Sequence, residues 1–178
     1  VYGETQTKAY DFVAGKVNLT RSGTPFPNMT GGKFAGGRQF DGNADVMLDG
    51  DQGALNGIDN ATMSAWIRRI GNSTRNYESI ITEGSQSGGG YSLTTDCNNS
   101  LIQFGVKNQT AGTIRQTNTS NSLITDGNWH LVTGVYDGDN DNISIYVDGV
   151  LRNSSTADID VSNSGLGVRV GGVTASAT

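Results

Sequence analysis

The sequence predicts an all-β protein, a two-sheet antiparallel sandwich or jelly roll without substantial helix. Three observations support this prediction. The 178 residues include 26 Gly, only 2 Pro and many Asn, Ser and Thr, a composition typical of strands joined by tight turns. Apolar and polar residues alternate through short segments. These segments are separated by Gly, Asn and Asp, and runs of strong helix formers are absent.

The clearest strand lies at residues 62–68. Met63, Ala65 and Ile67 share one of its faces, whereas the other face carries polar residues and Trp66. Shorter alternating or apolar segments predict the strands that follow, at residues 79–82, 91–94, 101–106 and 112–117.

The last third of the chain contains the strongest hairpin signal. Residues 129–136 and 143–147 both alternate, and the acidic loop 137–142 joins them. The pair Asp148-Gly149 then fits a two-residue type I′ turn that leads into a further strand. From strands of ordinary length we expect roughly nine to eleven in total, stacked as two sheets in one domain.

Charge and hydropathy exclude several partner classes. The net charge of −5 and the pI near 4.6 disfavour binding to nucleic acid or to anionic membranes. No apolar stretch approaches the roughly 20 residues that a membrane-spanning helix needs. Cys97 is the only cysteine, so no intramolecular disulfide can form.

Short motifs along most of the chain keep a characteristic order and spacing. They are RQFDGNADV at 38–46, MSAWI at 63–67, ITEG at 81–84, GYSL at 90–93, DGNWH at 126–130, VYDG at 135–138, IYVDGV at 145–150 and VGG at 170–172. Together they resemble the laminin G-like group of concanavalin A-like sandwiches. The resemblance implies two curved antiparallel sheets, of the kind found in extracellular adhesion, glycan-binding or accessory modules.

The resemblance is incomplete at both ends. Family members carry terminal strands that lie side by side, but here little precedes Lys8 and only a short tail follows Gly172. A sheet without these strands would expose unpaired backbone edges. We therefore expect either a fragment of a longer protein or an exchanged strand. In the second case residues 1–12 would complete a neighbouring molecule, and residues 13–178 would form the sandwich.

Glycosylation sequons are unusually frequent. With 17 Asn and 35 Ser plus Thr in 178 residues, a random arrangement gives roughly three Asn-X-Ser/Thr sites, but the chain has nine. We expect most of them to carry N-glycans, which places the protein outside the cell or at its surface. The alternative is an Asn-rich surface without sugar. The nine sequons begin at Asn18, Asn28, Asn60, Asn72, Asn98, Asn108, Asn118, Asn142 and Asn153.

Two groups of aspartates are candidate calcium ligands. Asp137, Asp139 and Asp141 alternate in the acidic loop and offer the oxygen ligands that Ca²⁺ prefers. The loop lacks the distal Glu of an EF-hand, and Asp also suits a hairpin turn, so both readings stay open. By the resemblance, Asp41 and Asp45 lie where related sandwiches carry a metal or a turn-stabilising aspartate. We expect no required cofactor, with Ca²⁺ as the one candidate.

The sequence lacks the patterns that catalysis needs. His130 is the only histidine, so it cannot assemble a zinc site with other histidines or cysteines, and no Gly-X-Ser-X-Gly accompanies it. Sandwich-type glucanases need two carboxyl groups about 5–9.5 Å apart. None of the three glutamates, Glu4, Glu78 and Glu83, has the spacing of such a pair on an evident strand. We therefore expect no enzymatic activity.

Four aromatic residues are candidates for stacking on sugar rings, because they lie opposite the aliphatic faces of their strands. They are Trp66, Tyr91, Tyr136 and Tyr146. The alternative is core packing, and the resemblance favours a framework position in the core for Trp66 and Trp129.

Three functional hypotheses follow. The first is a secreted, heavily N-glycosylated structural module of a filament, surface layer or sheath, which self-associates head to tail by strand complementation. The alternative is a calcium-assisted, lectin-like carbohydrate-binding module of a longer adhesion protein. The third is an accessory module of a larger enzyme.

Overall fold

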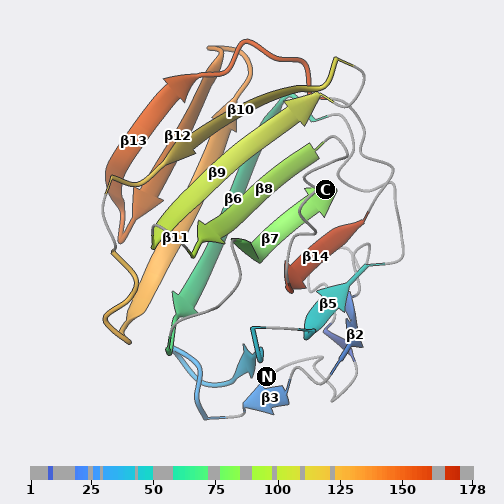
Figure 1. Ribbon diagram of the computed structural model, residues 1–178, viewed down its shortest axis with the longest axis vertical. Helices are drawn as coiled ribbons and strands as arrows, with labels where there is room; N and C mark the ends of the chain where they lie inside the picture. Colours follow the sequence, from blue (N-terminus) through green and yellow to red (C-terminus); the bar gives the residue numbers. More distant parts are fainter. Residues whose placement is uncertain are drawn as a thin grey trace.

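The structure is a computed structural model, shown in Figure 1. It describes residues 8–9, 19–23, 26–28, 30–42, 44–49, 58–71, 77–84, 90–97, 100–108, 111–120, 123–161 and 167–172. The described residues form fourteen strands and no helix. The all-β class predicted from composition and alternation is therefore confirmed.

Two antiparallel sheets form a sandwich, and a two-stranded ribbon lies beside them (Figure 1). The larger sheet has the order β1 (Lys8–Ala9), β2 (Leu19–Ser22), β5 (Val46–Leu48), β14 (Val168–Gly171), β7 (Tyr77–Gly84), β8 (Gly90–Asp96), β9 (Leu101–Asn108) and β10 (Thr113–Asn118). The smaller sheet has the order β13 (Val150–Thr156), β12 (Asn142–Val147), β11 (Trp129–Asp137) and β6 (Asn60–Arg68). The ribbon pairs β3 (Phe26–Asn28) with β4 (Gly37–Gln39).

The core lies between the two main sheets. The larger sheet contributes Tyr91, Leu93, Ile102, Phe104 and Val106, all at most 2% exposed. The smaller sheet contributes alternate residues of its strands, and the segment after β13 adds two more. These residues are Met63, Val132, Tyr136, Ile143, Ile145, Val147, Ala157 and Ile159.

The predicted hairpins are confirmed. Strands β11 and β12 pair from Val132 opposite Val147 to Asp137 opposite Asn142. At the next turn both Asp148 and Gly149 have positive φ, 54° and 77°, as a type I′ turn requires.

One expectation about the strands needs correction, and the structure decides the direction of one strand face that the sequence left open. The predicted number of strands is too low, because β1 to β5 are short and have little of the alternation that identifies longer strands. The alternation on β11 puts Trp129, Leu131, Thr133 and Val135 on one face, and the structure turns that face away from the core. Val132, Gly134 and Tyr136 face inward instead.

The N-terminal segment is described only at Lys8 and Ala9. These two residues pair with Thr20 and Leu19 of the same chain, at one edge of the larger sheet. The rest of the segment and residues 173–178 lie outside the described residues. Strand exchange by residues 1–12 therefore stays a prediction.

Candidate functional site

Aromatic residues gather on the outward face of the smaller sheet. Trp66 on β6, Trp129 on β11 and Tyr146 on β12 alternate with inward residues such as Met63 and Val132, so their side chains point away from the core. We call these three residues the aromatic face. Trp66 is 38% exposed, and the other two are half-buried. The core position expected for Trp66 and Trp129 is therefore wrong, because the strand register turns both side chains outward.

The loop between β3 and β4 extends this face. In Figure 1 that segment passes beside the lower end of β6. It carries Phe34, which is 80% exposed and meets Trp66 edge to face with ring centroids 5.6 Å apart. The neighbouring Lys33 places its Nζ 4.9 Å from the centre of the Trp66 ring. Neither Phe34 nor Lys33 could be found from the sequence, because no local pattern indicates that residue 34 lies next to residue 66.

Polar groups lie among these rings. Cross-strand pairing sets Trp66 opposite Leu131, and sets Thr133 between Ser64 and Tyr146. The Ser64 and Thr133 hydroxyls share a hydrogen bond of 2.9 Å. Trp66 and Tyr146 lie two strands apart and are offset by two residues along the strands, or about 12 Å at the usual strand spacing and rise. The surface therefore combines separated apolar rings with hydroxyl groups, an arrangement suited to an extended ligand with both apolar and hydroxyl faces.

Tyr91 and Tyr136 belong to the core and not to this surface. They are 2% and 4% exposed, so neither ring has a free face for a sugar. The Tyr91 hydroxyl donates to the Ile58 carbonyl, and the Tyr136 hydroxyl donates to the Ile159 carbonyl over 2.6 Å. Burial raises the pKa of Tyr91 well above its usual range, and nearby Glu83 adds to the rise. Both phenols therefore stay neutral donors.

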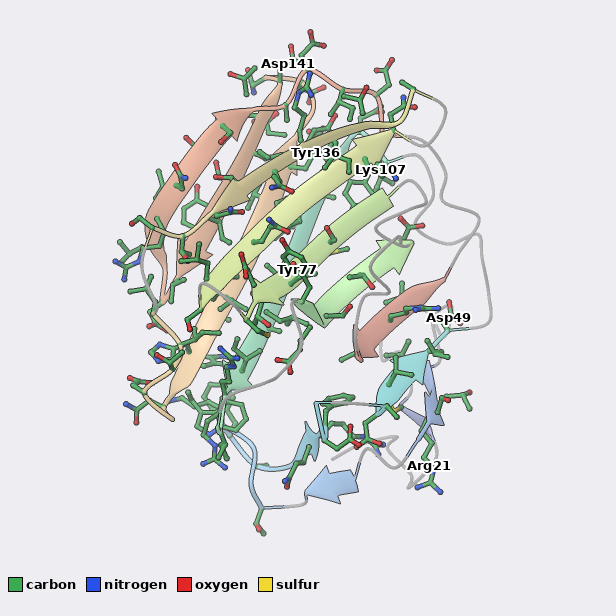
Figure 2. The ribbon with its side chains drawn as sticks, in the orientation of Figure 1. Arg21, Asp49, Tyr77, Lys107, Tyr136 and Asp141 are labelled. Carbon is green, nitrogen blue, oxygen red and sulfur yellow. The ribbon has the colours of Figure 1, made fainter. Side chains whose placement is uncertain are left out.

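The acidic loop is a hydrogen-bonded turn. Asp137 Oδ1 accepts the backbone N–H of Asn140 at 3.1 Å, and Asp139 Oδ2 accepts the side-chain amide of Asn60 at 2.9 Å. Asp141 has a positive φ of 49° and lies at the upper end of the molecule (Figure 2). Among the described residues no three acidic, histidine or cysteine side chains converge as a metal site. Calcium binding by this loop therefore stays a prediction, without a preformed ligand set in the described residues.

Asp41 and Asp45 cap one another's backbone. Asp41 Oδ1 accepts the N–H groups of Ala44 and Asp45 at 3.0 and 3.1 Å, and Asp45 Oδ2 accepts the Asp41 N–H at 3.0 Å. These reciprocal bonds fix the turn before β5. The geometry supports the turn-stabilising role that was left open from the sequence.

His130 bridges two carboxylates at the start of β11. Its Nδ1 lies 2.8 Å from Asp148 Oδ2, and its Nε2 lies 3.0 Å from Asp126 Oδ1. Asp148 also accepts the backbone N–H of Leu131 at 2.9 Å. The Asp148 contact, helped by Asp126 and opposed by partial burial, raises the pKa of His130. A protonated ring donates from both nitrogens, so this group ties the loop before β11 to the β12–β13 turn.

The structure describes six of the nine sequons. Asn60 and Asn153 are exposed, Asn108, Asn118 and Asn142 are half-buried, and Asn28 lies in β3. The other three predicted sites, Asn18, Asn72 and Asn98, lie outside the described residues.

Several described sequon amides already make hydrogen bonds within the protein. Asn153 Nδ2 donates to the Asn118 carbonyl at 2.9 Å, and Asn108 Nδ2 donates to the Asp160 carbonyl at 2.6 Å. Glycosylation stays a prediction.

The two described glutamates do not have glucanase geometry. Glu83 is 4% exposed and Glu78 is half-buried, and both lie on β7. Five residues along a strand correspond to about 17 Å, beyond the roughly 5–9.5 Å that glycoside hydrolysis needs. Glu4 lies outside the described residues.

Comparisons with known proteins agree with this architecture. The profile of the family described as the concanavalin A-like lectin/glucanases superfamily matches residues 40–177. No curated protein matches the sequence. The described part of the chain has no helix long and apolar enough to cross a membrane.

Solved structures with the same fold include bacterial binding modules. The binding domain of Paraclostridial Mosquitocidal Protein 1 aligns with a TM-score of 0.71 and 14% identity, over 97% of this chain and 43% of that one. The CBM40 module of the Ruminococcus gnavus IT-sialidase aligns with a TM-score of 0.54 and 14% identity, over 68% of this chain. The chain spans 66% of that module's length.

A further structure concerns botulinum neurotoxin type C, whose cell entry is described as dependent on two ganglioside molecules. It aligns with a TM-score of 0.58 and 16% identity, over 97% of this chain and 43% of that one. At these identities the likeness shows a shared fold.

Proposed function

Because this chain belongs to the concanavalin A-like lectin/glucanase superfamily, we propose that it is a non-catalytic carbohydrate-binding module. Its ligand is an oligosaccharide bound on the aromatic face, with the extended sugar crossing β6, β11 and β12 of the smaller sheet. The module acts outside the cell or at its surface, where such glycans are displayed.

The observation that carries this proposal is the outward placement of large aromatic side chains on a regular sheet. Phe34 and Trp66 are both exposed, with 80% and 38% of their surface accessible. The C–H groups on one face of a sugar ring are apolar and pack against an aromatic ring, whereas its hydroxyl groups need hydrogen-bonding partners. Ser64 and Thr133 supply such partners close to the rings.

The structural neighbours support the proposal at the level of fold. They include a sialidase CBM40 module and a neurotoxin whose cell entry depends on gangliosides. Calcium assistance, N-glycans and self-association into a surface assembly remain further proposals. They are compatible with a module that belongs to a longer adhesion protein.

A glycan array followed by calorimetric titration tests the proposal. The chain is expected to bind at least one oligosaccharide class, and Trp66→Ala should weaken that binding about tenfold or more, as loss of a central aromatic anchor does. Tyr146→Ala should also weaken it.

Ile114→Ala is the matched control, because it removes a 48% exposed apolar side chain from the other sheet. Melting temperatures of all variants confirm that they fold. An array without any bound glycan would refute the proposal. So would a folded Trp66→Ala variant with wild-type affinity.

A further inference from the structure

Two cations lie directly on the aromatic rings at one end of the smaller sheet. Lys33 lies over Trp66 at 4.9 Å, and the Arg68 guanidinium carbon lies 5.4 Å from the centre of the Trp129 ring. Arg68 and Trp129 are direct cross-strand partners of β6 and β11. Such contacts hold a charged group in place without neutralising its charge. We call Lys33, Arg68 and the two tryptophans the cationic end.

Both cations at this end lie on the protein surface. Both Lys33 and Arg68 are exposed, and neither makes an ion pair within the described residues. Asp126 and Asp148, which lie close to the start of β11, both contact His130.

The spacing of these groups suits a sugar that carries an acidic substituent. Trp66 and Arg68 are two residues apart on the same face of β6, a rise of about 7 Å. Lys33 reaches the same area from the loop between β3 and β4, and the adjacent Phe34 leaves 80% of its surface open for stacking. A guanidinium and an ammonium both donate to carboxylate or sulfate oxygens with charge-assisted hydrogen bonds.

We propose that the cationic end binds the carboxylate or sulfate of an anionic glycan, while the sugar ring stacks on the neighbouring aromatic side chains. This inference rests on the proposed carbohydrate-binding function and names the ligand class of the same site. The rest of the ligand extends over Thr133 toward Tyr146.

The test compares anionic oligosaccharides with their neutral counterparts. The array carries each neutral oligosaccharide beside its carboxylated and its sulfated form, and affinities are then measured by calorimetry at low and high salt. The expected result is tighter binding of one anionic form, with affinity that falls as salt rises because the charges are solvent-exposed. The carboxylated and sulfated arms identify which acid the site prefers.

Charge-removing variants locate the effect. Lys33→Gln and Arg68→Gln should each reduce the preference for the anionic over the neutral form, the ratio of the two affinities, roughly three- to tenfold. The matched control is Arg115→Gln, which removes an exposed positive charge from β10 on the other sheet. Lys33→Arg, which keeps the charge, should retain most of the affinity. Thermal melts establish that every variant is folded.

The possible outcomes distinguish the preference for anionic glycans from the carbohydrate-binding function on which it rests. Glycan binding with equal affinity for neutral and anionic forms overturns the inference and leaves the carbohydrate-binding function intact. Anionic preference that Arg115→Gln abolishes as strongly as Arg68→Gln also overturns it, because the effect would come from overall charge. The absence of any glycan binding refutes the proposed function and the inference together.

Discussion

The packing of Gly134 against Phe104 gives the sharpest prediction about stability. Gly134 lies in the middle of β11, facing the core, and Phe104 reaches toward it from β9 in the opposite sheet. A Cβ atom at residue 134 would lie 2.2 Å from Cδ2 of the Phe104 ring. Because non-bonded carbon atoms prefer about 3.5–4.0 Å, Gly134→Ala requires a shift of more than about 1 Å between the sheets or of the ring.

Phe104 has little room to move. It is fully buried, and its cross-strand partners are Leu93 and Thr117. Inserting an extra methyl group into a tight core lowers the free energy of unfolding by about 1–3 kcal/mol. For Gly134→Ala we expect a loss of about 3 kcal/mol or more, because Phe104 cannot move away. For a chain of 178 residues, 3 kcal/mol corresponds to a melting temperature lowered by about 6–12 °C.

Calorimetry or chemical denaturation measures the loss, and a second glycine provides the control. Gly105→Ala places a Cβ 3.3 Å from the Ser92 hydroxyl, which can rotate away, so its stability should change by less than about 1 kcal/mol. Phe104→Leu combined with Gly134→Ala should lose less stability than the sum of the two single changes. A Gly134→Ala protein as stable as the wild type would show that the two sheets do not pack in this register.

Two further predictions concern charge and modification. Hydrogen bonds to Asp148 and, to a smaller extent, to Asp126 raise the pKa of His130. The stability that His130 contributes is therefore present below about pH 6.5 and is lost as the pH rises through the raised pKa. The pKa of Asp148 is lowered, because hydrogen bonds from His130 and Leu131 outweigh its burial. The pKa of Asp126 is also lowered, mainly by a hydrogen bond from the Asn128 N–H. The stability that these two carboxylates contribute is lost at acidic pH, as they become protonated. The difference in unfolding free energy between wild type and His130→Gln should therefore be largest near pH 5–6 and shrink toward pH 9. A difference that does not change with pH would contradict a stabilising role for the contacts of His130 with Asp126 and Asp148. Enzymatic removal of N-glycans from the secreted protein should lower its intact mass; an unchanged mass would show that the sequons are unoccupied.

Local sequence features predicted the regular parts of the fold well. The Asp148-Gly149 pair predicted its turn because a positive φ at both positions is a local requirement that few residues tolerate. The inward set of Ile143, Ile145 and Val147 was also predictable, since a period of two in aliphatic residues marks a buried face. The short strands at the N-terminal end were not, because strands of two to four residues contain too little alternation to recognise.

The candidate site was only partly predictable. Alternation identified Trp66 and Tyr146 as residues opposite the aliphatic faces of their strands, and both are on the aromatic face. The same reasoning placed Tyr91 and Tyr136 with them, although both rings fill the core. Phe34 carried no signal, because its contact with Trp66 joins segments 32 residues apart.

The local sequence is enough to tell which side chains share a face of a strand and where the chain turns back. Both follow from backbone geometry within a few residues. Which face is buried is known only from the three-dimensional fold, because burial depends on the side chains that the opposite sheet contributes to the core. On β11 the more apolar face, with Trp129, points outward, and the face with Gly134 points inward because the Phe104 ring needs the space that a side chain would occupy.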